Sequence, residues 1–106
     1  MSTQVTFTAP LWQWRAREQS GDGGAWFFVT VPRELSEEIR DSRTGPPRGF
    51  GSVRVSAVAG GSSWDTSVFP DSDSGCFVLP VKKAVRLAEQ VDEDDELTVT
   101  LRVRDP

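Results

Sequence analysis

Apolar and polar residues alternate along several segments of the chain with a period of two, which is typical of half-buried β-strands. The clearest alternation covers residues 96–104, where the apolar positions are Leu97, Val99, Leu101 and Val103. The same period, or a dense run of aromatic and β-branched residues, indicates strands over 5–11, 25–31, 50–58, 63–69 and 76–79. The pattern therefore predicts about six strands.

The first predicted strand contains an irregularity. Pro10 cannot donate a hydrogen bond to a neighbouring strand, so it favours an edge position or a bulge. Trp12 and Trp14 continue the alternation beyond Pro10 with the opposite parity. A bulge near this position would explain the change of face.

Two segments have helical spacing, and each follows a proline. Leu35 and Ile39 lie four positions apart after Pro32. The apolar residues after Pro80 recur at helical spacing and are Val81, Ala84, Val85, Ala88 and Val91. Because a helix needs no N–H group at its first position, proline fits there. The sequence predicts two short proline-led helices, the second with the broader apolar stripe.

These elements occur in the same order twice, and Pro32 and Pro80 lie 48 positions apart. Each half reads strand, hairpin, strand, proline-led helix, strand, over about residues 4–58 and 62–104. This predicts a single domain over residues 1–106, built from two intertwined β-β-α-β repeats that share one core. Pairing between the halves would remove exposed strand edges, so we expect a mainly β, pseudo-two-fold, closed or nearly closed barrel with helices at its ends.

The second half is similar to the swapped-hairpin proteins of the AbrB and MazE type. In those proteins a strand meets a proline, a helix follows, and an acidic turn leads into a final strand. Residues 76–86 and 94–99 carry this similarity. Those proteins form intertwined dimers and many bind DNA, so the similarity implies a nucleic-acid-binding or regulatory alternative.

A second resemblance covers nearly the whole chain. Phe7, residues 24–27, residues 64–70 and residues 79–86 follow one another in the order seen in the bacterial domain of unknown function 1905. The resemblance implies a double-split β-barrel, related to the swapped-hairpin fold, with both halves in one chain. It implies no activity, because none is established for that family.

The composition excludes several kinds of site. The chain has no histidine, no tyrosine and a single cysteine, Cys76. Ser-His-Asp and Cys-His catalytic arrangements, imidazole metal ligands, a structural zinc site and an intrachain disulfide are therefore excluded. Neither of the common glycine-rich phosphate motifs occurs. We expect a protein that is not an enzyme and that has no metal site and no cofactor.

Charge and hydropathy restrict the partners. The net charge of −4 disfavours nonspecific binding to nucleic acid, which depends on neutralising phosphates. No segment approaches the roughly 18 apolar residues of a membrane helix, and no signal peptide is visible. We expect a cytoplasmic protein with no membrane contact. Because the halves would pair within one chain, folding needs no dimer, and we expect a monomer.

Lys82, Lys83 and Arg86 form the first candidate site. They lie in the first turns of the predicted second helix, where positive charge opposes the helix dipole. An anion at this helix N-terminus would relieve that repulsion. The hydroxyl groups of Thr66 and Ser67 would add donors if their strand lies nearby.

Two simpler interpretations of this basic cluster stay open. Its side chains can form a solvated basic face. Alternatively, they can pair with carboxylates such as Asp65 or those of residues 92–96.

The tryptophans form the second candidate site. The chain contains Trp12, Trp14, Trp26 and Trp64. Trp12 and Trp14 share a strand face, so an exposed aromatic patch could bind a protein partner or stack on bases. The alternative is that the tryptophans fill the barrel core or cover its open side.

These observations favour a small binding module whose ligand is an anionic or phosphate-containing molecule at the second helix N-terminus. A nucleic-acid-binding function would need a continuous basic surface that joins this cluster to Arg33, Arg40, Arg43 and Arg48. The third possibility is a protein-interaction domain that uses the aromatic patch.

Overall fold

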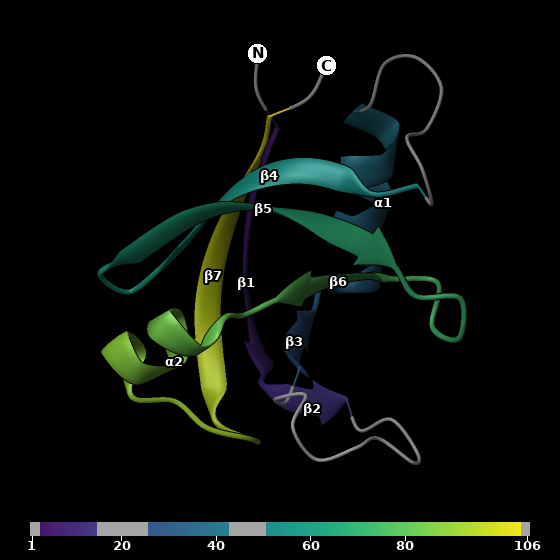
Figure 1. Ribbon diagram of the computed structural model, residues 1–106. Coiled ribbons are helices and arrows are strands. Elements are labelled where there is room, and N and C mark those ends of the chain that lie inside the picture. The colour runs from purple at the N-terminus through teal and green to yellow at the C-terminus, as the bar shows by residue number, and fades with distance from the viewer. Residues whose placement is uncertain (1–2, 15–25, 43–50, 105–106) are drawn as a thin grey trace.

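The computed structural model describes residues 3–14, 26–42 and 51–104. The elements in chain order are β1 (Gln4–Pro10), β2 (Trp12–Trp14), β3 (Trp26–Thr30), α1 (Arg33–Ser42), β4 (Val53–Ala59), β5 (Ser62–Pro70), β6 (Phe77–Pro80), α2 (Lys83–Glu89) and β7 (Glu96–Val103) (Figure 1). The protein is mainly β with two short helices, as predicted. The described residues form seven strands rather than about six, because the first predicted strand is divided into β1 and β2.

All seven strands form one antiparallel sheet in the order β1-β7-β4-β5-β6-β3-β2. In Figure 1, β4 and β5 run across the direction of β1 and β7, so the sheet curls into a half-barrel. The strands at the two ends of this order, β1 and β2, are consecutive in the chain. Residues 4–14 therefore contribute to both ends of the curled sheet.

The chain changes partner at Leu11, next to the bulge predicted at Pro10. Before it, β1 pairs with β7, and after it, β2 pairs with β3. The Leu11 N–H donates to the Asp95 carbonyl at 2.9 Å, and the Leu11 carbonyl accepts from the Asp94 N–H at 2.7 Å. The acidic turn before β7 thus holds the bend in place through its backbone.

The spacing of 48 positions recurs in the register of the sheet. Thr30 of β3 lies opposite Val78 of β6, and Val55 of β4 lies opposite Val103 of β7. In both pairs the two residues are 48 positions apart, like Pro32 and Pro80. The two pairings are therefore arranged with pseudo-two-fold symmetry. The division of the domain into two repeats stays a prediction.

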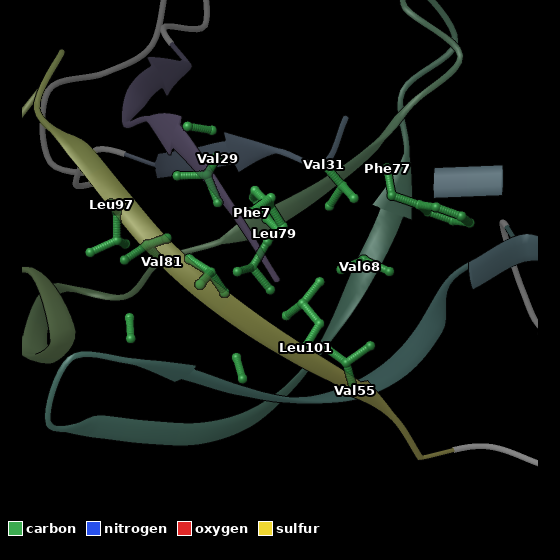
Figure 2. Close-up of a cluster of buried hydrophobic side chains, with 14 of the residues drawn as sticks. Phe7, Val29, Val31, Val55, Val68, Phe77, Leu79, Val81, Leu97 and Leu101 are labelled. Atoms are coloured by element: carbon green, nitrogen blue, oxygen red, sulfur yellow. The ribbon is translucent and has the colours of Figure 1, made fainter. Parts of the chain in front are cut away.

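The core lies inside the curled sheet and receives side chains from both halves of the chain. Figure 2 shows this cluster, in which the labelled residues are Phe7, Val29, Val31, Val55, Val68, Phe77, Leu79, Val81, Leu97 and Leu101. Burial alternates along β1 and β7, so that one face of each strand is apolar and covered. This agrees with the alternation read from the sequence.

The helices follow the two prolines at different distances. The Pro32 carbonyl accepts the first helical hydrogen bond of α1, from the Ser36 N–H at 2.8 Å. Pro80 is the last residue of β6, and two further residues separate it from α2. The apolar stripe of α2 is narrower than predicted, because Val85 is buried whereas Ala84 and Ala88 are exposed. No helix in the described ranges is long and apolar enough to cross a membrane.

The β4–β5 hairpin is attached to the end of α2. Ala59 pairs with Ser62, so Gly60 and Gly61 form the turn. The Ser62 hydroxyl donates to Oε2 of Glu89 at 2.6 Å. Gly60 has a φ of +59°, and a Cβ atom on it would overlap Oε1 of Glu89. The hairpin therefore needs glycine at the first of its two turn positions.

Replacing Gly60 by Ala is expected to lower the free energy of unfolding by about 1–2 kcal/mol, because Ala is strained at positive φ. Gly61→Ala is the matched control, since a Cβ there has no atom within 4 Å. Urea unfolding of both variants checks the prediction. The same pair in a Glu89→Ala background separates backbone strain from the overlap with the carboxylate. Equal free energies of unfolding for Gly60→Ala and Gly61→Ala would contradict the prediction.

Candidate functional site

A cavity of about 580 Å³ lies between the start of α2 and the strands β3, β5 and β6. It is lined by Trp26, Phe27, Trp64, Asp65, Thr66, Pro80, Val81, Lys82, Lys83 and Arg86. These residues come from segments far apart in the sequence. The sheet order places β5, β6 and β3 side by side, which brings the segments together.

Four of the five residues predicted for the anion site lie in this lining. Lys82, Lys83 and Arg86 come from the segment around the start of α2, and Thr66 comes from β5. Ser67 does not line the cavity. The pairing of β5 with β6 and the contact of β5 with α2 explain how Thr66 comes close to the basic cluster.

Arg86 is held over an aromatic ring. Its Cζ atom lies 3.9 Å from the centroid of the Phe27 ring. Its Nε–H donates to the Val81 carbonyl at 3.3 Å, and the Val81 N–H donates to the Phe27 carbonyl at 2.9 Å. The terminal nitrogens of Arg86 form no hydrogen bond among the described residues. The guanidinium group is therefore oriented, and its terminal N–H groups are available.

The lysines are exposed and carry uncompensated charge. Neither Lys82 nor Lys83 forms an ion pair with any part of the chain that the structure describes. Asp65, one of the alternative partners, lies 3.5 Å from Arg104 and accepts a hydrogen bond from the Ser56 hydroxyl at 3.0 Å. Among the residues that the structure describes, it is the only carboxylate that lines the cavity.

Two carboxylates of the acidic segment after α2 form hydrogen bonds within that segment. The Asp95 carboxylate accepts from the Asp92 N–H at 2.9 Å, and the Asp92 carboxylate accepts from the Glu93 N–H at 2.8 Å. These side chains stabilise their own turn. Of the two simpler interpretations of the basic cluster, a solvated basic face fits the described residues better than pairing with carboxylates. This face borders the cavity.

The N-terminus of α2 contributes less to anion binding than the sequence suggested. The helix has seven residues, and its N-cap, Lys82, makes no side-chain capping hydrogen bond. The macrodipole is the sum of aligned peptide dipoles, so a helix of this length provides little of it. Any anion affinity must come from the side chains that line the cavity.

A second cavity, of about 340 Å³, adjoins the outer face of β2 and β3. Its lining is Trp12, Trp14, Trp26, Phe28, Pro70, Asp71 and Val78. Trp12 and Trp14, the two residues of the candidate aromatic patch, both line this cavity. Cross-strand pairing adds Phe28 opposite Trp12, and Trp26 opposite Trp14. The sequence pattern did not show that the rings of Phe28 and Trp26 join this patch. The register of β2 with β3 shows it.

The tryptophans differ strongly in exposure. Trp64 belongs to the buried core, whereas Trp14 is 52% exposed and Trp26 is 57% exposed. The interpretation of the tryptophans as core residues therefore holds for Trp64 and not for these two. Trp12 is half-buried, and its Nε1–H donates to the Thr30 hydroxyl at 2.9 Å.

Two of the arginines named for a nucleic-acid surface form hydrogen bonds to backbone carbonyls. Arg33 donates to the Ser74 carbonyl at 2.9 Å, and Arg40 donates to the Gly75 carbonyl at 3.2 Å. They attach α1 to the loop before β6. Arg43 and Arg48 lie outside the described residues. Over the described ranges, no group of three or more Cys, Asp and Glu side chains is arranged to hold a metal ion.

Comparison with known proteins agrees with the wider of the two resemblances. The sequence model of a family described as Domain of unknown function (DUF1905) matches residues 7–101. No curated protein matches the chain. The similarity to the AbrB and MazE type stays a prediction. The matched range covers 95 of the 106 residues and includes every residue that lines the two cavities, so the chain belongs to the DUF1905 family.

Proposed function

We propose that the protein is a small, non-enzymatic binding module that takes up an anionic or phosphate-containing ligand in the cavity beside α2. The lining of this cavity carries the proposal. Over the described ranges, it combines three cationic side chains with three aromatic rings and one carboxylate, that of Asp65, which already has a cationic partner. Such a lining attracts negative charge.

The size of the cavity favours a small molecule. Its volume of about 580 Å³ falls within the roughly 300–1,000 Å³ typical of ligand sites. Most of its wall is apolar or aromatic, and a few polar groups converge on it, as in other small-molecule sites.

The polar groups have separate parts in binding. Lys82 and Lys83 supply mobile point charges with three donors each. Arg86 supplies a planar group that its contacts with Phe27 and Val81 already orient, so less entropy is lost when it binds a phosphate or carboxylate. The hydroxyl of Thr66 adds one further donor.

A small ligand is favoured over nucleic acid because Arg33 and Arg40 form internal contacts. Lys82, Lys83 and Arg86 line one cavity, whereas nucleic-acid binding would need a continuous basic surface. Nucleic-acid binding stays an alternative prediction.

Replacing both Lys82 and Lys83 by Ala is expected to weaken phosphate binding about tenfold or more, because hydrogen bonds to charged groups are lost. Both side chains are exposed, so the free energy of unfolding should change by only about 0.5 kcal/mol. Isothermal titration of the full chain with inorganic phosphate and ribose 5-phosphate at low salt measures the effect.

The matched control is the double variant Arg54→Ala, Arg102→Ala. Both arginines are exposed on the sheet and do not line the cavity, and their removal changes the net charge by the same amount. This control should bind like the wild type. An equal loss in both double variants would show a general charge effect. Failure of the wild type to bind either phosphate would refute the anion site.

A further inference from the structure

An anion site does not by itself explain the position and the exposure of Trp26. This residue lines the cavity beside α2 and also the aromatic cavity on the outer face of β2 and β3. It is 57% exposed, although a large apolar side chain is stabilised by burial. Phe27, the next residue, is buried below Arg86. The exposed indole of Trp26 and the oriented guanidinium group of Arg86 therefore line the same cavity.

The indole of Trp26 stacks on a neighbouring ring of the same sheet face. Its ring stacks on Phe28 with a centroid distance of 6.3 Å and an interplanar angle of 13°. Phe28 in turn lies 5.0 Å from the ring of Trp12, whose Nε1–H is bonded to Thr30. Because this row of rings orients the indole before any ligand arrives, little entropy is lost on stacking.

The cavity has far more room than a simple anion needs. A volume of about 580 Å³ compares with about 30 Å³ for one water molecule in the liquid. Inorganic phosphate could contact Lys82 and Lys83 without reaching the aromatic wall. A ligand that fills the site needs a flat apolar part in addition to its charge.

We propose that the ligand is a nucleoside monophosphate whose base stacks on Trp26 while its phosphate is bound by Lys82, Lys83 and Arg86. Aromatic side chains combined with basic groups are the usual means of holding an unpaired base and its phosphate. This assignment depends on the proposed function, because the same cations bind the phosphate in both.

Isothermal titration of the full chain with AMP, adenosine, ribose 5-phosphate and inorganic phosphate tests the assignment. AMP should bind the wild type more tightly than ribose 5-phosphate, which lacks the base, and more tightly than adenosine, which lacks the phosphate. Trp26→Ala should weaken AMP binding about 5- to 150-fold, the range expected for the loss of one base–aromatic stack. Ribose 5-phosphate should bind the wild type and this variant equally.

Trp14→Ala is the matched control. Trp14 is similarly exposed and lies opposite Trp26 in the sheet, but it lines only the aromatic cavity. It should change AMP affinity by less than about twofold, since it does not line the cavity beside α2. Trp26→Leu keeps an apolar side chain without a π face, so it should lose AMP affinity even if Trp26→Ala fails to fold.

Equal binding of AMP and ribose 5-phosphate by the wild type would overturn the stacking assignment and leave the anion site intact. So would unchanged AMP affinity in Trp26→Leu, or an equal loss in Trp14→Ala. If no phosphate compound binds the wild type, or if the Lys82→Ala, Lys83→Ala variant binds them all normally, the proposed function itself fails. The two failures are therefore distinguishable.

Discussion

Replacing Phe77 by Ala is expected to lower the free energy of unfolding by about 3–5 kcal/mol. Phe77 is 1% exposed and lies at the start of β6, where Arg40 covers one face of its ring at 5.1 Å from the centroid. The substitution removes buried apolar surface and leaves a cavity in the core. A domain of this size has a total stability of about 5–15 kcal/mol, so the variant would lose a large fraction of it.

Phe69→Ala is the control for Phe77→Ala. Phe69 is 41% exposed and lies on β5, the neighbour of β6. Its removal takes away the same side chain from a partly solvated position, so the loss should be about 1 kcal/mol. Urea unfolding of both variants, with the wild type alongside, gives the comparison. Similar losses at the two positions would contradict the placement of Phe77 in the core.

Replacing Ser36 by Ala is expected to lower the free energy of unfolding by about 1–3 kcal/mol, although serine is a small polar residue. Ser36 is 0% exposed. Its hydroxyl donates to the Val31 carbonyl at 3.0 Å and accepts from the Phe77 N–H at 3.0 Å. Ala removes both bonds and leaves a buried N–H group without a partner, which is the more expensive loss.

Ser42→Ala separates this effect from helix propensity. Ser42 lies at the end of the same helix, is half-buried, and donates to the Ile39 carbonyl at 2.8 Å. Both substitutions introduce a better helix former, so the difference in stability between the variants isolates the buried bonds. Amide hydrogen exchange at Phe77 should also accelerate in Ser36→Ala alone. Unchanged exchange there would refute the role assigned to the Ser36 hydroxyl.

Local pattern was sufficient to predict most of the fold. The alternation over residues 96–104 predicted β7, whose burial alternates in the same way. Pro10 and the change of parity at Trp12 predicted the irregularity that the structure places at Leu11. These features depend on neighbouring residues, which the sequence displays directly.

The candidate site could be predicted only in part. Lys82, Lys83 and Arg86 are close in sequence, so their clustering was visible. The contact of Arg86 with Phe27 and the position of Trp26 between two cavities depend on the register of β3 with β2 and β6. The buried Ser36 was missed because its partners, Val31 and Phe77, are brought together only by the packing of α1.

The pairing of β1 with β7 has a consequence for how the chain folds during synthesis. Gln4 pairs with Arg102, so β1 must wait for β7, which is translated last of the seven described strands. Until then the apolar face of β1, formed by Val5, Phe7 and Ala9, has no strand beside it. Contacts between such distant residues slow folding and prolong the exposure of apolar surface. We therefore expect the curled sheet to be completed only after translation of β7, which makes the nascent chain a candidate for chaperone binding.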